Sequence, residues 1–515
     1  MAQHLIKSTL VVGGMTTLSR ILGLVRDVVI ARLFGAGVGV DAFIVAFRIP
    51  NFLRRVFAEG GFSQAFVPML AEYREQRAHH EVQALLDHTT AVLGTALLVV
   101  TAIGVVAAPL LIVVFAPGFI GDPEKQDLAA QMLRVTFPYI FFISLTALAG
   151  GILNTWRRFA VPAVTPVLLN LSLIGSAIWL APRFEQPIVA LAWGVFAAGV
   201  VQLLFQFPFL AKLGLLPLPW RSRDAEGVRR ILRLMVPTLF AVSITQVNLL
   251  IDTLIASFLV TGSISWLYYS ERLIDFPLGV FGIALATVIM PALSADHARG
   301  MPTAYNRTLD WAVRWVFLIC VPAACGLALL SAPALAALFQ YGNFRELDVQ
   351  MAARSLVAFA FGLPAFVLIK VLSSAFFARQ DTRTPVRAAV VAMLSNIVLN
   401  LLFVVPLRHA GLALATALSA YVNAALLYRA LRKRDWFVPE PGWRAYAAKL
   451  AAAAAAMCAL LYLFVPAIGE WFGWRAVERA AQLVLWVAAG GICYFAMLWL
   501  CGIRPKRMTA PGGPL

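Results

Sequence analysis

Long apolar runs alternate with short polar connections along the whole chain. A run of about 20 predominantly apolar residues can cross the hydrocarbon core of a bilayer as an α-helix. The hydropathy pattern therefore predicts about fourteen membrane-spanning helices. The runs cover residues 5–34, 41–67, 84–115, 128–153, 161–181, 188–210, 231–259, 264–293, 309–339, 351–377, 386–406, 412–431, 445–465 and 476–500.

Composition supports the same class of protein. The chain has 515 residues, of which 61% are hydrophobic and only 13% are charged, and its mean hydropathy is +0.84. These values lie far outside the range of soluble globular domains. We expect an all-α polytopic membrane protein. The five cysteines lie in or beside apolar runs, and no histidine has the spacing of a metal ligand, so neither residue type predicts a metal centre.

Lys and Arg are concentrated in alternate connections. Cytoplasmic loops retain positive charge, so this bias predicts the orientation and places both termini in the cytoplasm. The net charge of +17 is scattered over these short loops. It predicts attraction to anionic membrane lipids and no nucleic-acid partner. The basic connections include Arg74 and Arg77, residues 157–158, 221–233, 379–387 and 429–434, and the tail at 504–507.

An internal repeat divides the chain. Residues 27–34 resemble 252–259, and residues 48–57 resemble 272–281 with a one-residue shift. The period is roughly 224 residues, or six helices, and an even number keeps both halves in the same orientation. Parallel repeats of this kind are related by an axis along the membrane normal, with the substrate site between the halves. We therefore predict two six-helix lobes around a central cavity, at 1–220 and 221–435, followed at 436–515 by two further helices and a basic tail.

Several arginines lie deep in the apolar runs. The helical rise places Arg20 roughly 18 Å from a start near Ser8, Arg54 roughly 20 Å from Asp41 and Arg272 roughly 12 Å from Ile264. Ionisable residues at such depth usually face a water-filled cavity and handle a charged cargo. Guanidinium groups bind phosphate bidentately, so the cluster predicts a phosphate or diphosphate ligand.

These buried charges could also have a purely structural role. The arginines could form interhelical ion pairs or extend their side chains to the interface, above all Arg26 and Lys370, which lie nearer a boundary. Asp27 shares a helix face with Arg20, and Glu59 lies one turn from Arg55. We expect these two acids to neutralise the arginines in part.

The polar motifs resemble those of a known family. Segments 19–27, 34–37, 41–43, 50–60, 62–68 and 72–73 look like the signature of the MurJ (MviN) lipid II flippase family. In the second half, Tyr269, Arg272, 276–277 and 378–385 are similar to the same pattern. The resemblance covers essentially the whole chain. It implies a member of the multidrug/oligosaccharidyl-lipid/polysaccharide exporter superfamily in a bacterial cytoplasmic (inner) membrane.

The resemblance also implies a cargo and the residues that handle it. The cargo would be lipid II, the undecaprenyl-diphosphate-linked disaccharide-peptide from which peptidoglycan is built. The last two helices would form a groove for its lipid tail, and cell-wall synthesis or division proteins are the expected protein partners. The family's substrate-binding arginines fall on Arg20, Arg26, Arg54 and Arg272. Its gate residues fall on Ser19, Asp41, Arg48 and Glu59, and the predicted gate and cavity set also includes Asp27, Arg55, Glu271 and Lys370.

We expect a transporter that works by alternating access and not an enzyme, because the external connections are too short to hold a catalytic domain. No nucleotide-binding loop is present, and no cofactor is expected. Sodium and the membrane potential stay open as driving forces. An oxygen-rich set could bind sodium, since Asp252, Asn400 and Thr416 share one depth and Asn396 lies one turn from Asn400, although its members could form ordinary interhelical hydrogen bonds. The set comprises Asp252, Asn396, Asn400 and Thr416.

Two other transport functions compete with lipid II translocation. An exporter of another polyprenyl-diphosphate-linked glycan would share nearly every physical feature, and only the motifs favour lipid II. A drug or cation antiporter of the same superfamily should have an acidic and aromatic cavity. The arginine-rich pattern argues against it.

Overall fold

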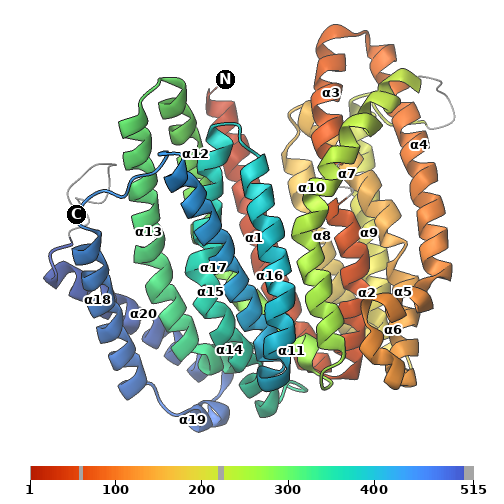
Figure 1. Ribbon diagram of the computed structural model, residues 1–515. Helices are drawn as coiled ribbons and strands as arrows, with labels where there is room; N and C mark the ends of the chain where they lie inside the picture. Colours follow the sequence, from red (N-terminus) through yellow and green to blue (C-terminus); the bar gives the residue numbers. More distant parts are fainter. Residues whose placement is uncertain (1, 57–61, 219–224, 504–515) are drawn as a thin grey trace. The chain divides into compact units, whose positions relative to one another are not determined.

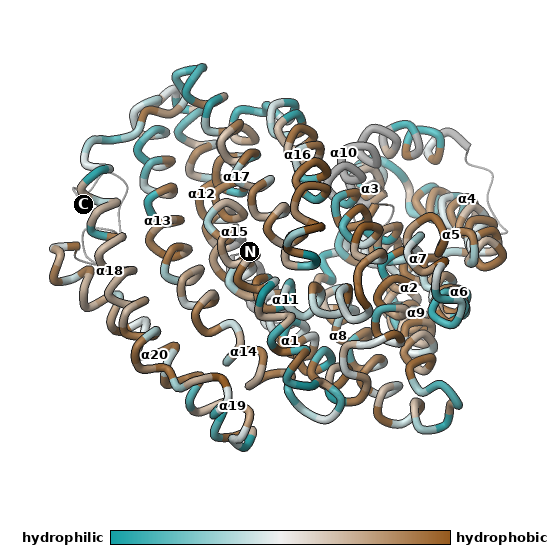
Figure 2. The backbone as a smooth tube through the Cα atoms, turned by 60° about the horizontal axis from the view of Figure 1, so that its bottom comes forward, coloured by the Kyte–Doolittle hydropathy of each residue, from teal (hydrophilic) through white to brown (hydrophobic). Residues whose placement is uncertain are grey.

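The computed structural model describes residues 2–56, 62–218 and 225–503, and every regular element in these ranges is a helix (Figure 1). By length and composition, 11 of the described helices can cross a membrane. The three remaining predicted runs correspond to α1, to α2 with α3, and to α10. The prediction of an all-α polytopic fold is confirmed. Hydrophobic residues follow the bodies of the long helices, and hydrophilic residues gather in the connections (Figure 2).

The chain forms two compact units, Met1–Gly262 and Ser263–Leu515. In the first unit, α1 packs on α8, α2 on α6, and α7 and α8 on α9. An apolar core joins α3, α4, α7 and α9. The elements are α1 (Ala2–Phe34), α2 (Val38–Arg54), α3 (Ser63–Gln76), α4 (His79–Val106), α5 (Ala108–Phe115), η2 (Pro117–Gly121), α6 (Pro123–Thr136), α7 (Tyr139–Thr155), α8 (Ala160–Gly175), η3 (Ser176–Leu180), η4 (Ala181–Arg183), α9 (Val189–Lys212) and α10 (Ala225–Ser257).

The second unit is built around α15, which packs against α11, α12, α13 and α17. Gly362 of α15 permits this packing, because a Cβ there would lie 2.8 Å from the Cβ of Ala417 on α17. The elements are α11 (Ser263–Pro277), η5 (Leu278–Gly282), α12 (Ile283–Ala298), α13 (Pro302–Leu329), α14 (Ser331–Phe339), α15 (Glu346–Ala378), α16 (Arg383–Leu407), α17 (His409–Lys433), α18 (Trp443–Phe464), α19 (Ile468–Gly473) and α20 (Ala476–Leu500).

The last two long helices, α18 and α20, form an antiparallel pair that packs on α13. Leu318, Leu450, Met457 and other apolar side chains make their shared core. The Tyr494 hydroxyl on α20 donates a hydrogen bond to the carbonyl oxygen of Leu318 at 2.9 Å. The pair is therefore attached to the second unit by both apolar packing and a buried polar contact.

Helix α10 packs within the first unit, against α3, α4, α5 and η2. The Gly118 amide of η2 donates to the Ser257 hydroxyl at the end of α10, 3.0 Å away. The repeat assigns α10 to the second lobe, as the counterpart of α1. The lobe limits at 220 and 221 stay a prediction, because a sequence repeat and a unit of packing are different properties of the chain.

The same helix-ending turn occurs in both units. Arg157 after α7 and Gln380 after α15 have positive φ angles of 60° and 59°. In each turn the following amide donates back to a carbonyl five residues earlier, from Arg158 to Leu153 at 2.8 Å and from Asp381 to Phe376 at 3.0 Å. This is a Schellman ending, which normally favours glycine. The separation of the two turns, from 157 to 380, is close to the sequence period of roughly 224 residues.

Asp381 fixes the second of these turns. Its carboxylate accepts hydrogen bonds from the Thr384 amide at 3.1 Å and hydroxyl at 2.6 Å, and from the Arg434 guanidinium at 2.6 Å. Burial alone would raise the pKa of Asp381, but the hydrogen bonds from Thr384 and Arg434 outweigh it and lower the pKa to about 2. The ionised carboxylate therefore stabilises the α15–α16 connection.

We predict that Asp381→Asn lowers the melting temperature of the purified protein at neutral pH, at a cost of about 0.5–1 kcal/mol for the lost ion pair. A depressed pKa contributes stability above the unfolded value and loses it as the pH falls. The difference from the parent should thus shrink between about pH 4 and pH 2. Thermal unfolding across this range checks the prediction, with the exposed carboxylate variant Glu470→Gln as control. A difference that does not change with pH would contradict it.

Candidate functional site

A buried ion pair on α1 is linked by a hydrogen bond to α8. Arg26 and Asp27 are buried, with 7% and 1% of their surfaces exposed. The Arg26 guanidinium contacts the Asp27 carboxylate at 2.7 Å and donates to the Asn170 side-chain oxygen at 3.1 Å. Asn170 in turn donates to the Ser19 carbonyl oxygen at 3.0 Å. Three predicted site residues are therefore linked through one asparagine of α8.

The partner of Asp27 in this arrangement is an arginine of its own helix. Helical spacing places Asp27 on the face of Arg20, but the carboxylate pairs with its neighbour Arg26. The physical reason is Asn170, which holds the Arg26 guanidinium beside Asp27. Arg20 lies on an exposed part of α1.

The predicted arginines of α2 are half-buried and contact uncharged polar side chains, among other partners. Arg48 donates to the Thr253 hydroxyl and Arg55 to the Gln246 side-chain oxygen at 3.1 Å, both on α10. Arg54 donates to Asn51, one turn earlier on its own helix, at 2.9 Å. Helix α10 thus holds two of the three guanidinium groups. Glu59, predicted as a partner of Arg55, lies outside the described residues.

Asp41, a predicted gate residue, contacts two other elements. Its side chain is 1% exposed and contacts the Lys125 ammonium group, itself 5% exposed, at 3.1 Å. The Gly262 amide donates to the same carboxylate oxygen at 2.8 Å. Lys125 also lies over the ring of Phe119, 4.5 Å from its centre. A buried ion pair therefore joins α2, α6 and the turn after α10.

In the second unit, Arg272 on α11 lies over the ring of Tyr268, 4.8 Å from its centre, and contacts the hydroxyl of the same residue at 3.1 Å. The Asp275 carboxylate is 3.7 Å away. The Arg272 side chain is 37% exposed, so solvent reaches the guanidinium. Glu271 and Lys370 are half-buried, and the stem of Lys370 packs against Gly282.

Three members of the predicted sodium site form a chain of hydrogen bonds between α16 and α17. Asn400 donates to Asn396 at 3.0 Å, and Asn396 donates to the Thr416 hydroxyl at 3.3 Å. This geometry is that of ordinary interhelical hydrogen bonds, the alternative to a sodium site. The fourth member, Asp252, is half-buried on α10 of the first unit. Within the described ranges, no group of three or more His, Cys, Asp or Glu side chains could hold a metal ion.

Sequence reasoning missed the partners that hold these groups. Lys125 belongs to a polar connection, and no spacing relates it to Asp41. Asn170 could have been predicted from the sequence, because an asparagine within an apolar run normally forms a hydrogen bond with a neighbouring helix. Thr253 is adjacent to the predicted Asp252 on α10, but Thr253 and Gln246 are both too common in type to stand out.

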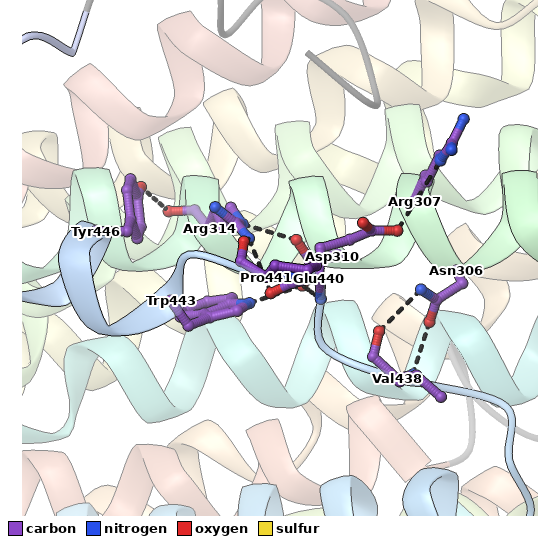
Figure 3. Close-up of polar contacts among 9 residues, drawn as sticks. All are labelled: Asn306, Arg307, Asp310, Arg314, Val438, Glu440, Pro441, Trp443 and Tyr446. Carbon is purple, nitrogen blue, oxygen red and sulfur yellow. Dashed lines mark hydrogen bonds and ion pairs between the residues drawn. The ribbon is translucent and has the colours of Figure 1, made fainter. Parts of the chain in front are cut away.

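A further buried polar cluster, also missed, attaches the segment before α18 to α13 (Figure 3). Asp310 accepts from Arg314 at 2.6 Å, from the Trp443 indole at 2.8 Å and from the Glu440 amide at 3.1 Å. The Tyr446 hydroxyl donates to the Arg314 carbonyl at 2.8 Å. Asp310 is thus saturated by donors from both elements. The cluster determines where α18 begins to pack.

The sequence matches one family over most of its length. The family described as lipid II flippase MurJ matches residues 30–478. The chain is 47% identical to the probable lipid II flippase MurJ of Vibrio cholerae serotype O1, over 99% of this chain and 98% of the relative. It is 46% identical to the probable lipid II flippase MurJ of Haemophilus influenzae, over 96% and 99%. It is 42% identical to the lipid II flippase MurJ of Burkholderia cenocepacia, over 97% and 98%.

Solved structures agree with these relatives. A lipid II flippase MurJ in an inward closed conformation aligns with a TM-score of 0.76 at 25% identity, covering 95% of this chain and 100% of the other. An inward-facing multidrug transporter of the MATE family aligns with a TM-score of 0.68 at 16% identity, covering 81% and 94%. At that identity the second match shows a shared fold alone.

The Asp41–Lys125 pair gives a stability test. Lys125→Met should cost about 3–5 kcal/mol, because it leaves the buried Asp41 carboxylate without its counter-charge. The double variant Asp41→Asn/Lys125→Met removes both charges and should recover most of the loss. Thermal unfolding in detergent measures both, with the exposed pair Arg77→Met/Glu81→Gln as the matched control. A double variant as unstable as Lys125→Met would contradict a paired role.

Proposed function

We propose a function from one premise: the chain belongs to the lipid II flippase MurJ family. It translocates lipid II, the undecaprenyl-diphosphate-linked disaccharide-peptide, from the cytoplasmic to the outer leaflet by alternating access. The observation that carries the proposal is near-full-length identity of 42–47% to relatives named for this activity. The protein is a transporter and not an enzyme.

Arginines supply the chemistry that the cargo needs. The diphosphate is the charged linkage in the polar head group of lipid II, and a guanidinium replaces its hydration with fixed hydrogen bonds. Arg20, Arg26, Arg54 and Arg272 are the proposed ligands. In this conformation Arg26 is held by Asp27. A bound phosphate would replace one anionic acceptor by another, which avoids leaving the buried guanidinium unpaired.

The location and orientation follow from charge and hydropathy. The chain is a multi-span membrane protein, and we place it in the bacterial inner membrane with both termini in the cytoplasm. Lipid II is the proposed cargo partner, and membrane lipids surround the spans. Exposed apolar side chains on α18 and α20 support a groove for the isoprenoid tail, since they leave both helices with a continuous apolar surface. They include Tyr462, Leu463, Val477, Val484, Ile492 and Phe495.

Transport measured with an arginine variant tests the proposal. Arg272→Lys keeps the positive charge but loses the bidentate geometry. We expect it to slow the movement of fluorescent lipid II across proteoliposomes by about tenfold or more, the loss of a charge-assisted hydrogen bond worth about 1.5–3 kcal/mol. Arg272→Ala should be slower still. Arg299→Lys, in an exposed connection, is the matched control.

The cargo in this assay separates the competing functions. Selective movement of lipid II that needs Arg272 supports the proposal. Equal movement of undecaprenyl-linked glycans with unrelated head groups would favour a general glycan exporter. Full activity of Arg272→Lys, in a correctly inserted protein, would remove the diphosphate-binding role.

The driving force has a test of its own. If Asp252 contributes to a sodium site with Asn396, Asn400 and Thr416, Asp252→Asn should weaken sodium-dependent transport while lipid II binding persists. Glu185→Gln is a control for loss of an exposed carboxylate. If transport by the parent does not depend on sodium but responds to an imposed membrane potential, the sodium site is rejected. Movement of charge through the transmembrane field is then the driving force.

A further inference from the structure

Helix α6 has an unusual surface for the start of a membrane span. One face packs into the first unit through Lys125, Leu128, Met132 and other side chains. The opposite face exposes Glu124, Asp127, Gln131 and Arg134, at helical spacing. A span that meets only acyl chains should expose apolar residues there. Figure 2 shows hydrophilic residues along α6 beside the hydrophobic α4.

This polar face lines a shallow groove of about 550 Å³. That volume lies within the range of small-molecule sites, roughly 300–1,000 Å³. Pro109 of α5 and Gln186 of the η4–α9 connection complete its walls. Within the described part of the chain, the side chains of Glu124, Asp127 and Arg134 form no hydrogen bond or ion pair. Charges of both signs are therefore presented in one groove without neutralising each other.

The surface beside the groove is apolar and exposed. On the adjoining α4 and α5, Ile103, Val106 and Leu110 expose 62%, 81% and 63% of their surfaces. Side chains of this kind on a spanning helix normally contact lipid acyl chains. The mixed-charge groove thus adjoins helices whose exposed apolar side chains can contact acyl chains, which matches the head group and the acyl chains of a phospholipid.

The order of the charged side chains along α6 indicates which lipid head group fits the groove. Asp127 and Arg134 are seven residues apart, or about 10 Å along the axis, and the arginine side chain leans toward the helix N-terminus. In the proposed orientation that end of α6 faces the periplasm, so the carboxylates lie nearer water and Arg134 nearer the hydrocarbon. An aminophospholipid has the same order, with its ammonium group outermost and its phosphate beneath.

We propose that this groove binds the head group of an outer-leaflet aminophospholipid. Asp127 and Glu124 accept hydrogen bonds from the ammonium group, Arg134 and Gln131 donate to the phosphate, and the acyl chains lie along α4 and α5. Binding at this site uses none of the residues proposed to handle lipid II. It would tie α5 and α6 to the composition of the surrounding membrane.

Native mass spectrometry of the delipidated, full-length protein tests the site. The probe is an equimolar mixture of phosphatidylethanolamine, phosphatidylcholine and phosphatidylglycerol with identical acyl chains. We expect phosphatidylethanolamine to be retained over each of the others by about threefold to fivefold, as for exposed ion pairs. Glu124→Gln/Asp127→Asn should abolish this preference and favour phosphatidylglycerol, whereas Arg134→Gln should reduce retention of all three lipids.

The second unit offers matched controls. Glu346 and Arg354 are exposed near the start of α15, outside the groove. Glu346→Gln and Arg354→Gln should leave the lipid preference unchanged. Arg134→Lys should restore most phosphate binding, which separates loss of charge from loss of fold. Equal retention of the three lipids by the parent, or an unchanged preference in the Glu124/Asp127 double variant, would overturn the proposal.

Discussion

Polar groups buried within an apolar helical body need hydrogen-bond or ion-pair partners there, because neither lipid chains nor apolar side chains can replace the hydrogen bonds of water. This constraint decides much of the packing within each unit. The contact of Arg26 with Asn170 brings α8 to α1, and the contacts of Asp41 with Lys125 and Gly262 bring α6 and the turn after α10 to α2. In the second unit, Asp310 plays the same part between α13 and the segment that leads into α18.

The constraint also connects fold to function. A flippase for a diphosphate-linked lipid must keep cations in a hydrophobic body, where an unpaired charge is strongly destabilising. Here Asp27 and Asn170 hold Arg26, and residues of α10 hold Arg48 and Arg55. Contacts of this kind can be exchanged for phosphate oxygens at modest cost, since one set of hydrogen bonds replaces another. Such an exchange is what the proposed binding of the diphosphate by these arginines requires.

The two lipid-facing surfaces discussed above differ in what they present. Helices α18 and α20 expose apolar side chains, which suits an isoprenoid tail that stays in hydrocarbon. The exposed face of α6 carries separated charges beside an apolar wall, which suits a head group at the level where water and hydrocarbon meet. The proposed cargo and the proposed membrane lipid would therefore occupy different surfaces of the protein.

Sequence alone determined the helical membrane class, the approximate limits of about fourteen spans and the family motifs, because hydrophobic length and local spacing are properties of short segments. It also identified most of the charged positions described in the two units. Only the tertiary structure decided their partners: Arg26 instead of Arg20 for Asp27, Lys125 for Asp41, and the first unit as the packing surface of α10. Lys125 and Gly262 meet Asp41 across 84 and 221 residues of chain. Such pairings depend on which helices pack together, and no local pattern in the sequence encodes that choice.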